Sequence, residues 1–234
     1  LGDVYKRQLI VGAIGSTYIY FDFGYKGGLF SLFSIVGMSV TAFLMIFYPA
    51  ISRHIKRKKL MTVLACISMV GYALMLVAGL VLPSTMLKFW VVTIGYALSN
   101  FGQYGYYLIM MISIINTVEY NEYRTGSRDE AIITSLRPFL TKMSSALIVL
   151  VTNLSYIIFG VTKYTNQISD FENECARNLI TEHEKTMAID NVIAGIEPGK
   201  TLALLLCMVI VPCVLMLLSH FLYKKPVSYT HLTL

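Results

Sequence analysis

The sequence predicts an all-helical membrane protein. Of the 234 residues, 56% are hydrophobic and only 14% are charged, and the mean hydropathy is +0.66. An ordinary soluble domain has about 25% charged residues, so this chain has too little polar surface to cover a core in water. Its apolar residues also gather in runs of about 20 or more, the length that a helix needs to cross roughly 30 Å of hydrocarbon.

Six apolar segments are expected to form transmembrane helices. In chain order they are residues 9–21, 28–51, 60–82, 88–116, 131–162 and 201–223. The first is too short to cross a bilayer alone, and we interpret it as the outer end of a truncated helix. The fifth is one span only if Arg137 and Lys142 are tolerated inside it. Residues 163–200 then form a long polar loop, with an amphipathic stretch near 170–191 that favours a short surface helix.

The two ends of the chain are set apart from this pattern. Residues 1–8 and 226–234 resemble translations of a transposon-end sequencing adapter, read forward at the front and as the reverse complement at the back. Segments of this kind are excluded from fold reasoning. We therefore expect native material over residues 9–225, from the interior of a longer gene.

The distribution of basic residues predicts the orientation. Nine lysines and arginines fall in the loops after the second and fourth segments and after the last, while six fall on the opposite side. Because basic residues concentrate in cytoplasmic loops, the C-terminus is expected to be cytoplasmic and the 163–200 loop external. The basic cluster at residues 53–59 is then an orientation signal, which leaves nucleic-acid binding as the poorer explanation of the net charge of +6.

No pattern of catalytic or metal-binding residues is evident. The four cysteines have no paired spacing, and the histidines are scattered over loops, a span end and the 226–234 segment. A disulfide framework or zinc site would show regular Cys or His spacings. The sequence thus predicts no enzyme, no cofactor and no metal site within this chain.

The fifth segment carries the most unusual charge in the sequence. If its helix begins near residue 131 at the cytoplasmic face, a rise of 1.5 Å per residue puts Lys142 roughly 16 Å deep, close to the bilayer midplane. A charge at that depth costs about 2.5–3.5 kcal/mol on the lenient insertion scale and usually faces a cavity or a partner. None of the 13 acidic residues lies within a predicted span, so the partner of Lys142 is expected outside this chain.

Two polar stripes at helical spacing are candidates for a substrate cavity. One includes Arg137 and Thr141 on the fifth segment, and the other includes Tyr96, Asn100, Gln103 and Tyr107 on the fourth. Aromatic rings with hydrogen-bonding edges suit sugars, whose ring faces are apolar and whose rims carry hydroxyl groups. A hydrogen-bonded seam between helices explains the second stripe equally well.

Residues 118–147, with the sequence VEYNEYRTGSRDEAIITSLRPFLTKMSSAL, resemble a family motif. The chain is similar here to the glycoside–pentoside–hexuronide:cation symporters, the melibiose-permease branch of the major facilitator superfamily. Their signature is an acidic-Tyr-x-Glu turn, a Thr-Gly-x-Arg-x-Glu loop and a helix with an embedded lysine. The matching residues are Glu119, Tyr120, Glu122, Thr125, Gly126, Arg128, Glu130 and Lys142.

This resemblance implies the six-helix C-terminal bundle of a twelve-helix carrier that couples uptake of a sugar, glycoside or uronide to Na⁺ or H⁺. It implies that Lys142 lies near a cation site whose aspartates come from the missing N-terminal bundle, and that Tyr107 borders the cavity. A cytoplasmic gate network would include Glu119, Glu122, Arg124 and Arg128. The family often has aspartate where this chain has Asn116, which is a departure from that network.

The sequence therefore predicts half of a sugar:cation symporter that works by alternating access in a bacterial plasma membrane. Its expected partners are the sugar, the coupling cation, lipid and the missing bundle. Arg137 departs from the neutral residue of some family members, and its guanidinium favours an anionic uronide. The alternative is a membrane scaffold or sensor that uses the same fold without transport.

Overall fold

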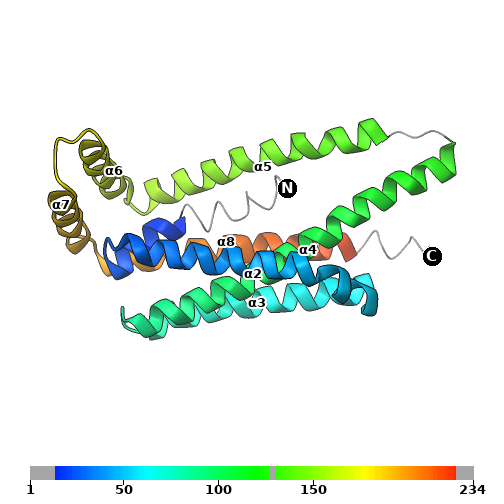
Figure 1. Ribbon diagram of the computed structural model, residues 1–234, viewed down its shortest axis with the longest axis horizontal. Coiled ribbons are helices and arrows are strands. Elements are labelled where there is room, and N and C mark those ends of the chain that lie inside the picture. Colours follow the sequence, from blue (N-terminus) through cyan, green and yellow to red (C-terminus); the bar gives the residue numbers. More distant parts are fainter. Residues whose placement is uncertain (1–13, 127–129, 225–234) are drawn as a thin grey trace.

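The computed structural model describes residues 14–126 and 130–224, which are helical apart from short connections and contain no strand (Figure 1). A helical segment over residues 14–23 comes first. The helices that follow are α2 (Gly27–His54), α3 (Arg57–Val81), α4 (Met86–Thr125), α5 (Glu130–Ile158), α6 (Thr162–Ala176), α7 (Glu182–Ala194) and α8 (Pro198–Lys224).

Several of these helices are suited to cross a membrane. Within the described residues, Gly28–His54, Arg57–Val81 and Pro198–Phe221 are long and apolar enough to do so. A fourth span exists if Ser145–Ile158 and Thr162–Ala176, which meet at a bend of 109°, are counted as one. Large apolar side chains face outward, among them Ile46 at 72% and Phe221 at 62% exposure. Such a surface requires lipid rather than water as its solvent.

Helix α4 is longer than the expected span of 88–116. Its 40 residues correspond to a length of about 60 Å, twice the thickness of the hydrocarbon core. In Figure 1 its second half leads away from α3 toward the connection with α5. The charged residues near its C-terminal end thus continue the helix instead of ending it.

Helices α3 and α4 pack with their backbones unusually close together. A Cβ atom added at Gly102 would lie 2.3 Å from the carbonyl oxygen of Leu64, and one at Gly71 would lie 2.5 Å from that of Gly95. Small residues allow such an approach between membrane helices, which gain stability from close packing and interhelical hydrogen bonds. One such bond runs from Ser68 Oγ to the carbonyl oxygen of Ser99 at 2.8 Å.

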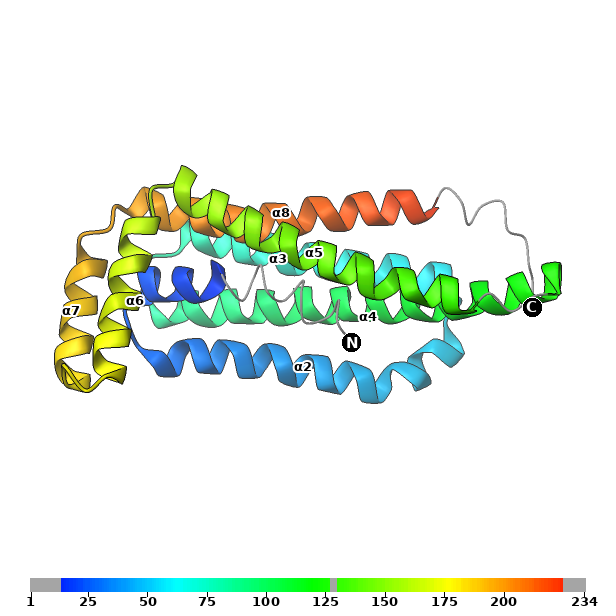
Figure 2. The same ribbon diagram turned by 90° about the horizontal axis from the view of Figure 1, so that it is seen from above.

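The polar loop at 163–200 contains two helices, α6 and α7, instead of the single short helix predicted within it. We call these two helices the cap, because they lie across the ends of the other helices (Figure 2), and we call that end of the molecule the cap end. Ile168 of α6 and Ile189 of α7 are buried in the main hydrophobic core. That burial explains why both helices form and dock.

The start of each cap helix has a local cause. Helix α5 stops at Ile158, and Gly160, at a φ of 63°, turns the chain into α6 because glycine adopts this left-handed conformation without strain. Helix α7 begins with a capping box. Glu184 N–H donates to Thr181 Oγ1 at 3.3 Å, and Thr181 N–H donates to Glu184 Oε2 at 2.8 Å.

Candidate functional site

The polar stripe on α4 is divided between two neighbouring helices. Gln103 Nε2 donates a hydrogen bond to the hydroxyl oxygen of Tyr72 on α3, and both side chains are buried. Tyr96 instead stacks on Phe33 of α2, with ring centroids 4.1 Å apart and an interplanar angle of 12°. Gln103 therefore takes part in a seam between helices, one of the two roles that the sequence left open.

Asn100 faces the interface between α2 and α4. Its side chain is 3% exposed, and its Nδ2 atom has no hydrogen-bond partner among the described residues. A Cβ atom at Gly37 on α2 would lie 2.8 Å from that nitrogen, so the glycine makes room for the amide. A buried unsatisfied polar group costs about 1–3 kcal/mol, and it is therefore a natural point of attachment for a ligand hydroxyl.

Tyr107 lies two turns farther along the same helix. It is 8% exposed and packs in a small cluster with Leu44 of α2 and Tyr104 of α4. Asn100 and Tyr107 are thus both buried beside α2, whereas Gln103 bonds to α3. The assignment of all three residues to a substrate cavity stays a prediction.

Lys142 lies on α5, about 18 Å along the helix from Glu130. Its side chain is exposed, and among the described residues no carboxylate forms an ion pair with it. Arg137 and Thr141 belong to the same helix, but their side chains lie outside the described residues. The role of this polar face of α5 in cation coupling or sugar binding stays a prediction.

Polar side chains connect the cap-end half of α5 to its neighbours. The Tyr156 hydroxyl and Thr17 Oγ1 are 2.7 Å apart, and Ser155 Oγ lies 3.0 Å from Cys207 Sγ. These contacts join α5 to the segment 14–23 and to α8. They fix the helix on which Lys142 lies at its cap end.

Most side chains of the predicted gate network lie outside the described residues. Arg128 and the side chains of Glu119 and Arg124 are not among the described residues, whereas Glu122 is described and exposed. The grouping of these four charges stays a prediction.

Sequence reasoning missed a contact near this network. With the Asn116 amide oriented to satisfy both of its ends, its oxygen accepts from the Arg57 guanidinium at 3.1 Å and its nitrogen donates to the Ile112 carbonyl at 3.2 Å. At position 116, Arg57 thus has a neutral amide oxygen as its acceptor. The signal for this partner was the basic cluster at residues 53–59, which precedes the third apolar segment on the same side of the membrane as the end of the fourth.

The cap carries its own ionic contacts. Lys185 Nζ lies 2.6 Å from Glu182 Oε2, and this contact lowers the pKa of Glu182. The Tyr25 hydroxyl donates to Glu172 Oε1 at 2.8 Å. Burial and then this hydrogen bond raise the pKa of Tyr25. The Lys185–Glu182 pair lies within α7, whereas the Tyr25–Glu172 hydrogen bond joins the cap to the segment before α2. No group of three or more metal-ligating side chains occurs in the described part of the chain.

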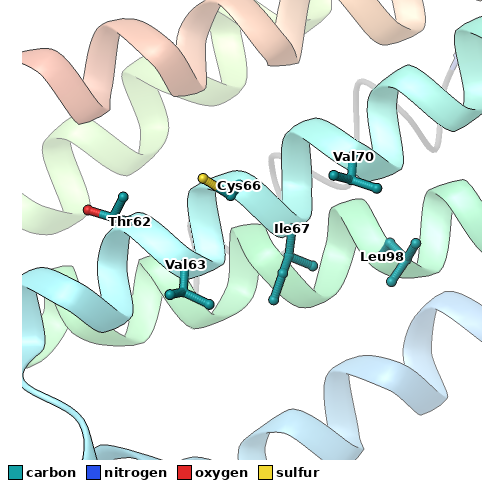
Figure 3. Close-up of a pocket in the computed structure, with 6 residues that line it drawn as sticks. All are labelled: Thr62, Val63, Cys66, Ile67, Val70 and Leu98. Atoms are coloured by element: carbon teal, nitrogen blue, oxygen red, sulfur yellow. The ribbon is translucent and has the colours of Figure 1, made fainter.

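A shallow hollow of about 330 Å³ lies on the outer face of α3 (Figure 3). It is lined by Thr62, Val63, Cys66, Ile67, Val70 and Leu98. The Thr62 hydroxyl already donates to the carbonyl oxygen of Lys58 at 3.1 Å. The hollow therefore offers little polar chemistry to orient a sugar, and lipid is the natural occupant of such an apolar surface.

Comparison with known proteins identifies similar sequences. The model of the family described as MFS/sugar transport protein matches residues 8–225. The chain is 27% identical over 153 residues to a raffinose carrier protein of Pediococcus pentosaceus, a match that covers 65% of this chain and 23% of the relative. It is 29% identical over 99 residues to a lactose permease of Leuconostoc lactis, covering 42% and 14%. No solved structure matches the chain.

Proposed function

Because the chain belongs to the MFS/sugar transport protein family, as its resemblance at residues 118–147 indicated, we propose that it forms the C-terminal six-helix bundle of a sugar:cation symporter. The match over residues 8–225 is the observation that carries this proposal. Its relatives are named as a carrier and a permease and not as enzymes, which supports a membrane transporter. The matched segments cover less than a quarter of each curated relative, so the activity of the whole protein is part of the proposal.

The proposed substrate is a galactoside. Both relatives are named for sugars that contain a galactosyl unit, raffinose and lactose. The buried amide of Asn100, without a partner among the described residues, is the group that we assign to a sugar hydroxyl. Tyr107, on the same side of α4, would offer its ring to an apolar sugar face. Arg137 and Thr141 would complete the cavity from α5.

The proposed coupling group is Lys142. Its ammonium would compete with Na⁺ or H⁺ for carboxylates of an N-terminal bundle, so that cation binding changes which conformation is favoured. A ligand shifts a conformational equilibrium only through its different affinity for the two states. A positive charge on a membrane helix would supply that difference, and the absence of an ion pair to the exposed Lys142 side chain among the described residues supports this role.

The proposed orientation puts the cap outside the cell and the C-terminus in the cytoplasm. The basic cluster at 53–59 supports it, because the α2–α3 connection lies at the end of the molecule opposite the cap. Alternating access would then expose the site between the two bundles first at the cap end and later at the opposite end.

Uptake of radiolabelled sugars by the full-length protein tests this function. Cells that express it should accumulate labelled raffinose or lactose, and removal of Na⁺, or collapse of the proton gradient, should lower that accumulation. Asn100→Ala should raise the half-saturating sugar concentration. The matched control is Ser99→Ala, because that neighbouring hydroxyl donates within its own helix, to the Tyr96 carbonyl at 2.8 Å.

Three other outcomes would contradict the proposal in part or in whole. Accumulation of a glucuronide in preference to galactosides would contradict the proposed galactoside and favour an anionic substrate, the class that Arg137 suits. Uptake that is indifferent to every cation gradient would refute symport. Binding of sugar without uptake would favour the scaffold or sensor.

A further inference from the structure

A buried ion pair lies at the cap end, away from the predicted site. Lys88 Nζ is 2.7 Å from Asp22 Oδ2, and the two side chains are 8% and 6% exposed. The Tyr18 hydroxyl donates to the same carboxylate oxygen at 2.8 Å, and Ser84 Oγ donates to Asp22 Oδ1 at 2.5 Å. The carboxylate thus joins the segment 14–23 to α4 and to the turn before it.

Each charge lies at the unfavourable end of its own helix. Asp22 is in the last turn of the helical segment 14–23, and Lys88 is in the first turn of α4, which begins at Met86. The helix dipole disfavours an anion at a C-terminus and a cation at an N-terminus. Burial adds a desolvation penalty to both charges. Neither residue is therefore explained by local helix stability.

A buried ion pair is weak evidence for a stabilising role, because a well-packed apolar pair of similar volume is often as stable or more stable. Its best-attested use is to fix a register or to act as a switch. Parting the two charges into water would restore their hydration, which offsets much of the lost attraction. Such a pair is suited to hold two helix ends together in one state and to release them in another.

The same region is also held by the cap. Directly after Asp22, Gly24 has a φ of 83° and redirects the chain toward α2. The next residue, Tyr25, donates its backbone N–H to Asp190 Oδ1 at 3.3 Å and its hydroxyl to Glu172 Oε1 at 2.8 Å. Residues 22–25 are therefore joined to α4 on one side and to both cap helices on the other.

We propose that Asp22 and Lys88 are positioning residues that form a latch for the cap end of the carrier, a role that rests on the proposed transport function. With the pair closed, the external ends of the segment 14–23 and α4 stay together. When the carrier opens toward the cap side, the end of the segment 14–23 moves away from α4 within this bundle, and the two charges separate and are hydrated. The latch sets the balance between the two open states and touches neither sugar nor coupling ion.

Sugar affinity measured from each face of the full-length carrier tests the latch. Apparent affinity scales with the fraction of protein in the binding-competent state. The double variant Asp22→Asn/Lys88→Met removes both charges and leaves none unpaired. It should lower the half-saturating concentration at the cap face roughly fivefold and raise it at the opposite face, as expected for a typical conformational coupling.

Two further variants serve as controls. The exchanged pair Asp22→Lys/Lys88→Asp puts each charge at the favourable end of its helix and keeps the attraction, so its ratio of the two affinities should stay near that of the wild type. The variant Glu182→Gln breaks a cap ion pair of similar length, 2.6 Å, at its 79% exposed carboxylate and keeps Lys185, whose ammonium lies over the Tyr25 ring. That variant should leave the ratio unchanged.

A distance between two spin labels reports whether the latch is closed, and it does not depend on transport. Spin labels at two exposed positions, Lys26 and Leu87, should give one short distance in the wild type. A second, longer population should appear in the double variant. Absence of sugar uptake by the wild type would refute the proposed function, and the spin-label distances would still decide on the latch.

Two results would overturn the latch. One is an active double variant that keeps the wild-type ratio of the two sugar affinities. If the carrier is inactive, the corresponding result is a double variant with the wild-type distribution of spin-label distances. The other is a double variant that fails to accumulate in the membrane, because the pair would then be required for folding.

Discussion

Gly102→Ala probes the close packing of α3 and α4. The added Cβ would lie 2.3 Å from Leu64 O, 2.7 Å from Ser68 N and 2.8 Å from Ser68 Cβ, whereas ordinary van der Waals contact begins near 3.4 Å. Two of the three obstacles are backbone atoms, so a side-chain rotation cannot relieve them. The two helices must therefore separate by about 1 Å at this point.

The expected destabilisation follows from that displacement. A radial gap of about 0.5–1 Å forfeits roughly a quarter to a half of each contact's dispersion energy. Overpacking of well-packed interiors costs about 1–3 kcal/mol. The intrinsic helix preference for alanine over glycine opposes this by about 1 kcal/mol. We expect a net loss of up to about 2 kcal/mol, and weakening of the Gln103–Tyr72 hydrogen bond across the same interface.

Thermal unfolding of the full-length protein in detergent, followed by the loss of monodisperse protein on size-exclusion chromatography, measures this effect. Gly28→Ala is the control, because a Cβ there has nothing within 4 Å. Gly102→Ala should lower the unfolding midpoint, and the control should leave it unchanged or raise it slightly. An equal or higher midpoint for Gly102→Ala would refute the close approach of α3 and α4.

Three further predictions concern other contacts. Gln103→Leu removes the hydrogen bond to Tyr72 and should lower the free energy of unfolding by about 0.6 kcal/mol, the average for such bonds in membranes. If Gln103 only joins α3 to α4, the half-saturating sugar concentration should not change. A tenfold rise in that concentration would place Gln103 in the sugar cavity. Asn116→Asp should strengthen the contact with Arg57 by at most about 1 kcal/mol and raise the unfolding midpoint slightly, so a lower midpoint would count against that contact. Hydrogen bonds from the α7 cap hold the pKa of Glu184 below its ordinary 4.5, so its contribution is full above that value and is lost as pH falls through the lowered pKa. Amide exchange of α7, corrected for intrinsic rates, should therefore speed up below about pH 4.5 in the wild type and show no such step in Glu184→Gln.

The sequence predicted best those helices that are apolar along nearly their whole length. Helices α2 and α8 contain the apolar segments 28–51 and 201–223, and α3 contains all but the last residue of 60–82. Each is a long apolar run flanked by charged or turn-forming residues. Helix α4 extends beyond its segment to Thr125, because polar residues can continue a helix out of the apolar region, and it ends where Gly126 adopts a φ of 72°. Hydropathy marks where lipid ends and not where a helix ends.

Contacts between residues far apart in the chain could not be predicted from the sequence. Asp22 follows the first apolar segment and Lys88 begins the fourth, 66 positions later, yet the fold brings their charged atoms to 2.7 Å. In the cap, the sequence predicted one short surface helix near 170–191 but not two helices docked on the core, because their short apolar faces become stable only against the core at Ile168 and Ile189. Lys142, in contrast, stood out from the sequence alone, because a charge is rare in an apolar run of that length.

The movement of cations driven by sugar tests the coupling role of Lys142 most directly. Addition of raffinose or lactose to vesicles that contain the full-length protein should draw Na⁺ or H⁺ inward with the sugar. Lys142→Met should abolish this ion influx and leave exchange of labelled for unlabelled sugar in place, whereas Lys142→Arg should retain part of it. An influx of wild-type size in Lys142→Met would contradict the coupling mechanism.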